Sequence, residues 1–162
     1  MPEPSKTDPA KADPARRVGT YRSRVFVGGS YHQEDRSRLA DIKSEIIKAG
    51  FVPVVADEVQ LENEGDIHYE TMVLLHSCRL AIFELSQLSG ALMEIERVPD
   101  YGIQALVLFA APGGQGYLPS RMASTFIEQH SASISLKRYL SVVEAKRFVR
   151  QWLKSMRKAG FG

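Results

Sequence analysis

The sequence predicts an α/β protein built on a five-stranded parallel sheet, and three observations favour this class. Short apolar runs alternate along the 162-residue chain with segments whose apolar residues recur at helical spacing. The run LAIFEL (80–85) is almost wholly apolar, as is typical of a central parallel strand covered on both faces. Pro53 interrupts the run at 51–56 and favours an edge position for it. We therefore expect a Rossmann-like three-layer sandwich with the flavodoxin-like strand order 2-1-3-4-5.

The elements follow from these patterns in chain order. Strands are predicted at 24–29, 51–56, 80–85, 104–110 and, more weakly, 133–139. Helices are predicted at 34–50, 66–78, 90–101, about 120–129 and about 142–158.

Local signals support three of these helices. The first carries apolar residues on one face and stops at a glycine: Leu39, Ile42, Ile46, Ile47 and then Gly50. Asp66 is a plausible N-cap for the second helix, and Ser141 with Glu144 forms a capping box before the last. Acidic residues between 57 and 65 and the glycine-rich stretch 111–120 are expected to be loops.

Composition indicates a single domain of ordinary size. Hydrophobic residues make up 44% and charged residues 25%, as in globular proteins, and no apolar run reaches the roughly 18 residues that a membrane span needs. Residues 1–20 are rich in Pro, Ala, Lys and Asp and lack the apolar core of a signal peptide. We expect a disordered tail there, one folded domain over 21–162, and a cytoplasmic setting, which the single cysteine, Cys78, also fits.

Charge is nearly balanced overall but unevenly placed. The net charge is +2, yet eight Lys or Arg residues and one acid, Glu144, lie between Lys137 and Lys158. Such a cluster can bind nucleic acid, but it is more often the solvated face of a helix. Nucleic-acid binding is disfavoured because no aromatic stacking platform interleaves the charges.

Ligands of such sheets bind beyond the carboxyl ends of the strands, near the point where the strand order reverses. This rule selects the segments 28–32, 57–59, 84–90 and 111–116. The first makes Gly28, Gly29, Ser30 and Tyr31 candidate substrate contacts, since backbone N–H groups there can hold a phosphate. The segment is not a dinucleotide-binding or Walker A motif, and its alternative interpretation is an ordinary tight turn.

The segment SQLSGALMEIE (86–96) holds the main catalytic candidate. Ser86 and Ser89 can cap a helix, and Gly90 permits close approach of a ligand. Glu94 lies one turn further on between apolar neighbours, so it is either a solvated helix residue or a carboxylate held in a cleft. Glu84 ends the third strand and is a rival acid, although strand-end acids often only cap loops.

Other chemistries receive little support. The four histidines show no metal-ligand spacing, so no metal site is expected. His76 is expected near the surface, and Cys78, which precedes a buried strand, in the core. Ser30 lacks the context of a nucleophile elbow.

Four segments, between about Arg24 and Lys154, resemble a known family. They are VFVGGSYHQEDR, DIHYETMVLLHSCRLAIFELSQ, SGALMEIERVPDYG and YLPSRM. The chain resembles the nucleoside 2-deoxyribosyltransferase-like proteins and is most similar to the 2′-deoxynucleoside 5′-phosphate N-hydrolases. More distantly, its fold is similar to that of TIR-type domains, some of which cleave NAD with a glutamate in a comparable place.

The resemblance implies a nucleotide-cleaving enzyme that needs no metal or redox cofactor and forms a homodimer. It implies that Glu94 is the nucleophile and that Gly29, Ser30, Ser89 and Gly90 contact the nucleotide and its phosphate. It also implies that two residues, Ser120 and Met122, make contacts across the dimer. Glu70 or Glu84 would then handle the proton on the leaving base.

Two departures from the family pattern keep a second hypothesis open. Thr71, beside Glu70, stands where the family has an aspartate, and Leu88 stands where the transferases have another. These positions fit either an N-glycosidase acting on a nucleotide, with a TIR-like NAD glycohydrolase as a variant, or a nucleotide-binding module without catalysis. A panel of nucleotides assayed for free base separates the enzyme from the binding module.

Overall fold

The computed structural model describes residues 23–29, 33–55, 67–86, 91–110 and 121–161. Within them, five strands form one parallel sheet in the order β2-β1-β3-β4-β5, which confirms the predicted topology. The strands are β1 (Arg24–Gly29), β2 (Val52–Val55), β3 (Leu80–Glu84), β4 (Gln104–Ala110) and β5 (Ile134–Tyr139). Pro53 lies in the edge strand β2, as its missing N–H requires.

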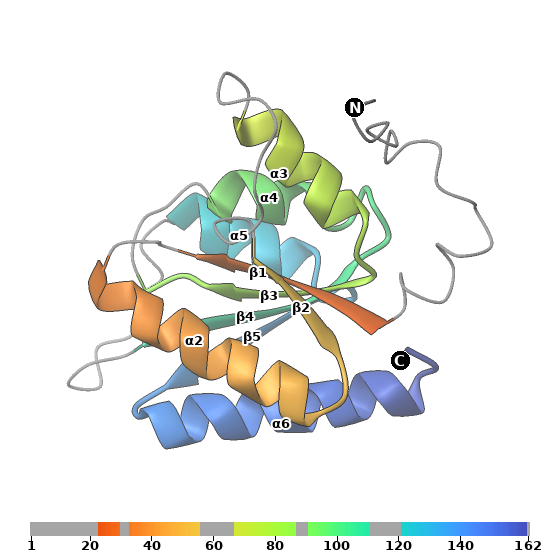
Figure 1. Ribbon diagram of the computed structural model, residues 1–162. Coiled ribbons are helices and arrows are strands. Elements are labelled where there is room, and N and C mark those ends of the chain that lie inside the picture. The colour runs from red at the N-terminus through yellow and green to blue at the C-terminus, as the bar shows by residue number, and fades with distance from the viewer. Residues whose placement is uncertain (1–22, 30–32, 56–66, 87–90, 111–120, 162) are drawn as a thin grey trace, which may run out of the picture.

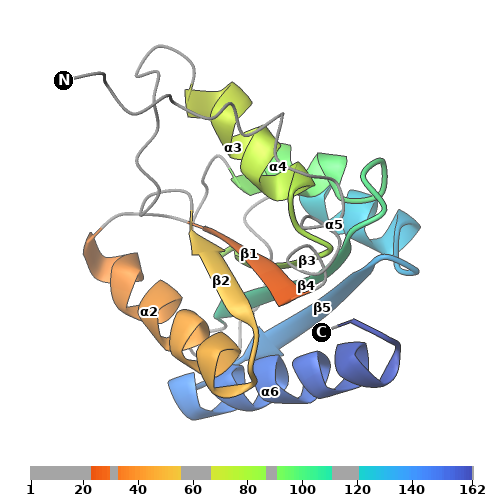
Figure 2. The same cartoon turned by 45° about the vertical axis from the view of Figure 1, so that its right-hand side comes forward.

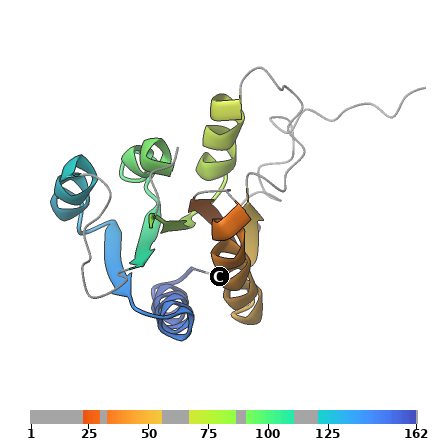
Figure 3. The same cartoon turned by 90° about the vertical axis from the view of Figure 1, so that its left-hand side faces the viewer.

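Helices cover both faces of this sheet (Figure 1). Three of them, α3 (Ile67–His76), α4 (Ala91–Arg97) and α5 (Arg121–Gln129), pack on one face. The other two, α2 (Gln33–Lys48) and α6 (Val142–Lys158), lie side by side on the opposite face, as Figures 2 and 3 also show. The protein is therefore a three-layer α/β/α sandwich.

Two hydrophobic clusters fill the spaces between the layers, and β3 shows how the sequence separates them. Ala81 and Phe83 belong to the cluster under α3, α4 and α5, whereas Leu80 and Ile82 belong to the cluster under α2 and α6. This alternation follows from the two-residue period of a strand. All five residues of β3 are buried, in accord with a central position in the sheet. By the same alternation, Glu84 faces the α2 and α6 layer.

The end of α4 differs from the sequence-based prediction. The helix was expected to continue to residue 101, but it stops at Arg97 and a turn follows. Pro99 explains the difference, because it has no N–H to donate to Ile95 and it disfavours helical geometry at Val98. The Val98 N–H instead bonds the Ile95 carbonyl at 3.1 Å, and the chain enters β4 through Gly102 at φ +64°.

Several local predictions are confirmed. Ser141 caps α6, since its hydroxyl accepts the Glu144 N–H at 3.2 Å. Cys78 is buried in the core, where burial raises the pKa of its thiol to about 11. His76 is exposed and packs edge-on against the ring of Tyr101.

Other predictions fall outside the described residues. They concern the tail at 1–20, the loops at 57–65 and 111–120, and the cap at Asp66. In the part of the chain that the structure describes, no helix combines the length and the apolar character needed to cross a bilayer.

Candidate active site

Three strands end side by side at the edge of the sheet where ligands of this fold bind. In the parallel register Gly29 of β1 pairs with Glu84 of β3, and Glu84 pairs with Leu108 of β4. The predicted ligand segments that follow β1, β3 and β4 therefore leave the sheet from adjacent positions.

The two glycines that end β1 are both buried, and packing explains why they lack side chains. A Cβ atom on Gly28 would lie 2.7 Å from Cδ1 of Phe83. On Gly29 it would lie 3.0 Å from the Glu84 carbonyl oxygen and 3.1 Å from Cδ2 of Leu39. Each distance is shorter than an ordinary van der Waals contact. Close packing is therefore a second reason for glycine at these two positions, beside the predicted role of their backbone N–H groups in holding a phosphate.

Glu94 is buried in the first turn of α4, where its side chain is unusual. The residue is only 9% exposed, and its Oε2 atom has no hydrogen-bond partner among the described residues. Burial raises the pKa of this carboxyl from 4.5 to about 7. No described charge offsets this cost, so the carboxyl is close to half ionised at neutral pH.

Its neighbours on α4 show that the burial is selective. Met93 and Glu96 are exposed, whereas Ala91 and Ile95 pack into the core. Glu94 therefore lies on the inner side of the helix, and the hypothesis that it is a solvated helix residue is wrong for this side chain. Catalytic acids and nucleophiles are often carboxyl groups that are buried beside a ligand-binding edge and have shifted pKa values.

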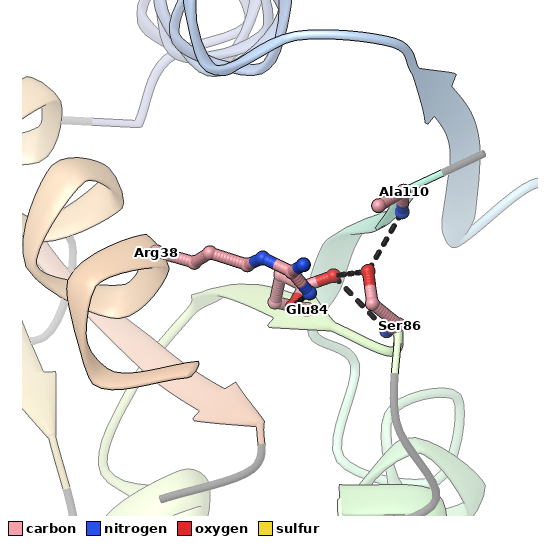
Figure 4. A network of polar contacts seen from close by, with 4 residues as sticks. All are labelled: Arg38, Glu84, Ser86 and Ala110. Atoms are coloured by element: carbon pink, nitrogen blue, oxygen red, sulfur yellow. Dashed lines mark hydrogen bonds and ion pairs between the residues drawn. The ribbon is translucent and has the colours of Figure 1, made fainter. Parts of the chain in front are cut away.

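Glu84 has the opposite kind of environment, because polar partners surround it (Figure 4). Its Oε1 accepts the backbone N–H of Ser86 at 3.0 Å and also the Ser86 hydroxyl. Its Oε2 lies 3.7 Å from Nη1 of Arg38 on α2. Tyr139, at the end of β5, also interacts with this carboxylate and lowers its pKa.

These neighbouring groups shift one another's pKa values. Burial raises the pKa of Glu84 above 4.5, and the hydrogen bonds from Ser86 and the charge of Arg38 oppose that rise. Burial and the Glu84 charge raise the pKa of Tyr139 to about 12. Sequence reasoning did not identify Arg38 or Tyr139. The position of Tyr139 at the carboxyl end of a parallel strand was the available signal.

The two carboxylates are associated with different layers. Glu84 contacts α2 and the end of β5, whereas α4, which carries Glu94, packs on the other face of the sheet. Thr71 of α3 is also buried, at 7% exposure.

The other candidates lie outside the described residues or side chains. They are Glu70, Ser30, Tyr31, Ser89, Gly90, Ser120 and Met122. Among the described residues, no group of three or more His, Cys, Asp or Glu could hold a metal ion.

Comparison with known proteins identifies the fold. No family model and no curated protein matches the sequence. The CMP N-glycosidase BcmB of Clostridium botulinum matches in structure with a TM-score of 0.55 at 17% identity, over 80% of this chain and 98% of that one. A flavodoxin from the domain Archaea matches with a TM-score of 0.51 at 12% identity, over 83% and 99%.

The fold is flavodoxin-like. At these identities the two likenesses concern the arrangement of strands and helices, and both agree with the observed strand order.

Proposed function

We propose that this protein cleaves the N-glycosidic bond of a nucleotide, with Glu94 as the nucleophile. The observation that carries the proposal is the buried Glu94 carboxyl, whose Oε2 has no hydrogen-bond partner among the described residues. Its position, one turn into the helix after β3, matches the expectation from the family resemblance. A CMP N-glycosidase with the same fold supports the reaction class.

The reaction follows from the chemistry of a desolvated carboxylate. In its ionised form, Glu94 attacks C1′ of the sugar as the bond from C1′ to the base nitrogen breaks, and the bonding electrons leave with the base. The base takes up a proton to become neutral. Water then attacks C1′, the carboxylate is released, and the water loses a proton, so that the sugar phosphate carries a new hydroxyl.

Substrate recognition by backbone N–H groups around Gly29 and Ser30 remains a proposal, as do the homodimer and the roles of Ser120 and Met122 in it. Glu70 stays a candidate proton donor to the base.

The proposal is tested by incubating the protein with a panel of deoxynucleotides, ribonucleotides and NAD and measuring free base by chromatography. Wild type should release base from at least one member, and Glu94→Gln should lower the rate by on the order of 10³-fold. Glu96→Gln is the matched control, because this exposed glutamate lies on the same helix. Equal rates for wild type and Glu94→Gln would remove Glu94 from the chemistry.

The pH profile of the active substrate distinguishes the two roles that a carboxyl can play. A nucleophile acts when ionised, so kcat/KM should rise with pH up to about 7, the pKa of Glu94. A general acid acts when protonated, and kcat/KM would then fall through the same range.

A second candidate is a nucleotide-binding module without catalysis. Thr71 favours it, because a buried neutral residue occupies the place where the resembling family has an acid. It predicts binding of a panel member, measured by calorimetry, without release of base. Release of base from NAD alone would instead favour the TIR-like alternative.

A further inference from the structure

Glu84 connects four elements at the edge of the sheet where the proposed substrate binds. Its carboxylate accepts hydrogen bonds from Ser86 after β3, pairs with Arg38 of α2 and interacts electrostatically with Tyr139 of β5. Through Ser86 it also reaches β4, since the Ser86 hydroxyl oxygen accepts the Ala110 N–H at 2.7 Å. Figure 4 shows Ser86 between Glu84 and Ala110.

These contacts fix the direction in which the chain leaves β3. Leu85 extends the pairing with β4, because its N–H bonds the Leu108 carbonyl at 2.8 Å. At the next residue, both Ser86 donors point to the single oxygen Oε1 of Glu84. Only four residues then separate Ser86 from Ala91, where the helix carrying Glu94 begins. Because the connection is this short, the position of Ser86 limits how far from the end of β3 the helix α4 can start.

The environment of Glu84 argues against direct contact with the reacting atoms. Its side chain is only 3% exposed, its Oε1 accepts hydrogen bonds from Ser86, and its Oε2 lies beside the Arg38 guanidinium. α4 lies over the opposite face of the sheet. A carboxylate with this many partners is suited to hold groups in place, as buried polar networks generally do.

We infer that Glu84 is a positioning residue of the proposed glycosidase: its carboxylate orients Ser86 and thereby holds the helix that carries Glu94 against the sheet. The inference rests on the proposed function for its catalytic meaning. Its structural content, that Glu84 and Ser86 maintain the burial of Glu94, can be measured without a substrate.

The first experiment is a titration of Glu94 by carbon-13 NMR in the full chain labelled at glutamate, with Glu94→Gln used to assign its signal. In Glu84→Gln, which keeps the size but removes the charge, α4 should be held less firmly and water should reach Glu94. Its pKa should fall by about one unit or more toward the ordinary value of 4.5. Ser86→Ala should lower it in the same direction while leaving the Glu84 carboxylate in place.

Glu45→Gln is the matched control. Glu45 is also a buried carboxylate, but it lies on α2 and pairs with Arg150 at 3.3 Å and with Lys48 at 3.8 Å. It should leave the Glu94 pKa unchanged. An unchanged Glu94 pKa in both Glu84→Gln and Ser86→Ala would overturn the inference, and so would an equal shift in Glu45→Gln, which would show general loosening.

The second experiment is a double-mutant cycle on whichever panel member releases base. The cycle combines Glu84→Gln with Ser86→Ala. If Glu84 acts through Ser86, the double variant should lose no more of kcat/KM than the more impaired single variant. Losses that multiply would mean that Glu84 acts on the substrate directly. If the Glu94 pKa moves as expected but wild type releases no base, the positioning role stands and the proposed function fails.

Discussion

A carboxylate that is buried without a partner lowers the stability of a folded protein whenever it is ionised. The Oε2 atom of Glu94 has no hydrogen-bond partner among the residues that the structure describes, and burial raises the pKa of this carboxyl to about 7. A helix position can be made more stable by a neutral side chain of the same shape, so an ionisable residue at this position costs stability. Residues with this property are concentrated where a protein uses their charge, which is consistent with a role for Glu94 in chemistry.

We predict that Glu94→Gln stabilises the protein at alkaline pH but not at acidic pH. The folded state holds the Glu94 proton up to about pH 7, whereas the unfolded chain releases it near 4.5. The unfolded state thus binds fewer protons between these values, and wild-type stability falls as the pH rises through them. Above pH 7 the variant should be more stable by up to about 3 kcal/mol, and below about pH 4.5 the difference should disappear.

Urea denaturation of both proteins between pH 4 and pH 8.5 measures this difference. Glu96→Gln serves as the control, because its exposed side chain should show no comparable pH dependence relative to wild type. A Glu94→Gln variant that is less stable than wild type at pH 8 would show that the ionised carboxylate is satisfied in solution.

At the scale of single elements, the glycines that end β1 have two possible explanations, and the sequence alone does not distinguish them. The glycines at its end were predicted to admit a phosphate, but the structure shows that a side chain on Gly28 would meet the ring of Phe83. That ring is wholly buried and packs against Phe26, with 5.8 Å between the ring centroids.

We therefore predict that Gly28→Ala destabilises the fold even without any ligand. The new methyl group would lie 2.7 Å from Cδ1 of Phe83, so the ring or the strand must shift, at a cost of about 1–3 kcal/mol. Chemical denaturation in the absence of nucleotide measures the cost. Ala81→Gly, which removes a buried methyl group from the neighbouring strand, gives a comparison for the loss of core packing. Unchanged stability of Gly28→Ala would leave ligand binding as the reason for the glycine.

Much of this architecture could be predicted from the sequence because its causes are local. The apolar run of β3, the proline of β2 and the cap at Ser141 each identify their element from a few adjacent residues. The end of α4 was predicted four residues too late, because helical periodicity was weighed above the effect of Pro99.

The candidate site was predictable only where its residues lie in one segment. Glu84, Ser86 and Glu94 come from one stretch of chain that runs from the end of β3 into α4. Arg38 and Tyr139 reach Glu84 from α2 and β5, and such long-range contacts leave no spacing in the sequence.

On the scale of the whole molecule, many cations of the basic C-terminal region contact other groups of the protein. Of its eight Lys and Arg residues, at least five have partners in the structure. Lys146 pairs with Asp41 at 3.4 Å and Arg150 with Glu45 at 3.3 Å. Arg157 bonds the Ala49 carbonyl and lies over Phe51. The other two of these five, Lys137 and Arg147, lie near the ring of Phe148, at 5.8 and 5.4 Å from its centroid.

Three of these contacts join α6 to α2 or to the turn between α2 and β2. The charges therefore help to hold the α2 and α6 layer together. A surface whose cations are already paired gains less from releasing the counterions of a nucleic acid than one whose cations are solvated. Phe148, the ring beside Lys137 and Arg147, is half-buried and hence a poor platform for stacking bases.

We accordingly predict that the protein does not bind nucleic acid at physiological salt concentrations. Fluorescence anisotropy with a labelled single-stranded oligonucleotide should show weak binding at about 50 mM salt, and this binding should be lost by about 200 mM. Lys154→Glu provides the control, because Lys154 is an exposed cation on α6. Binding that persists at the higher salt and is abolished by Lys154→Glu would establish α6 as a nucleic-acid surface and would require a function beyond cleavage of a free nucleotide.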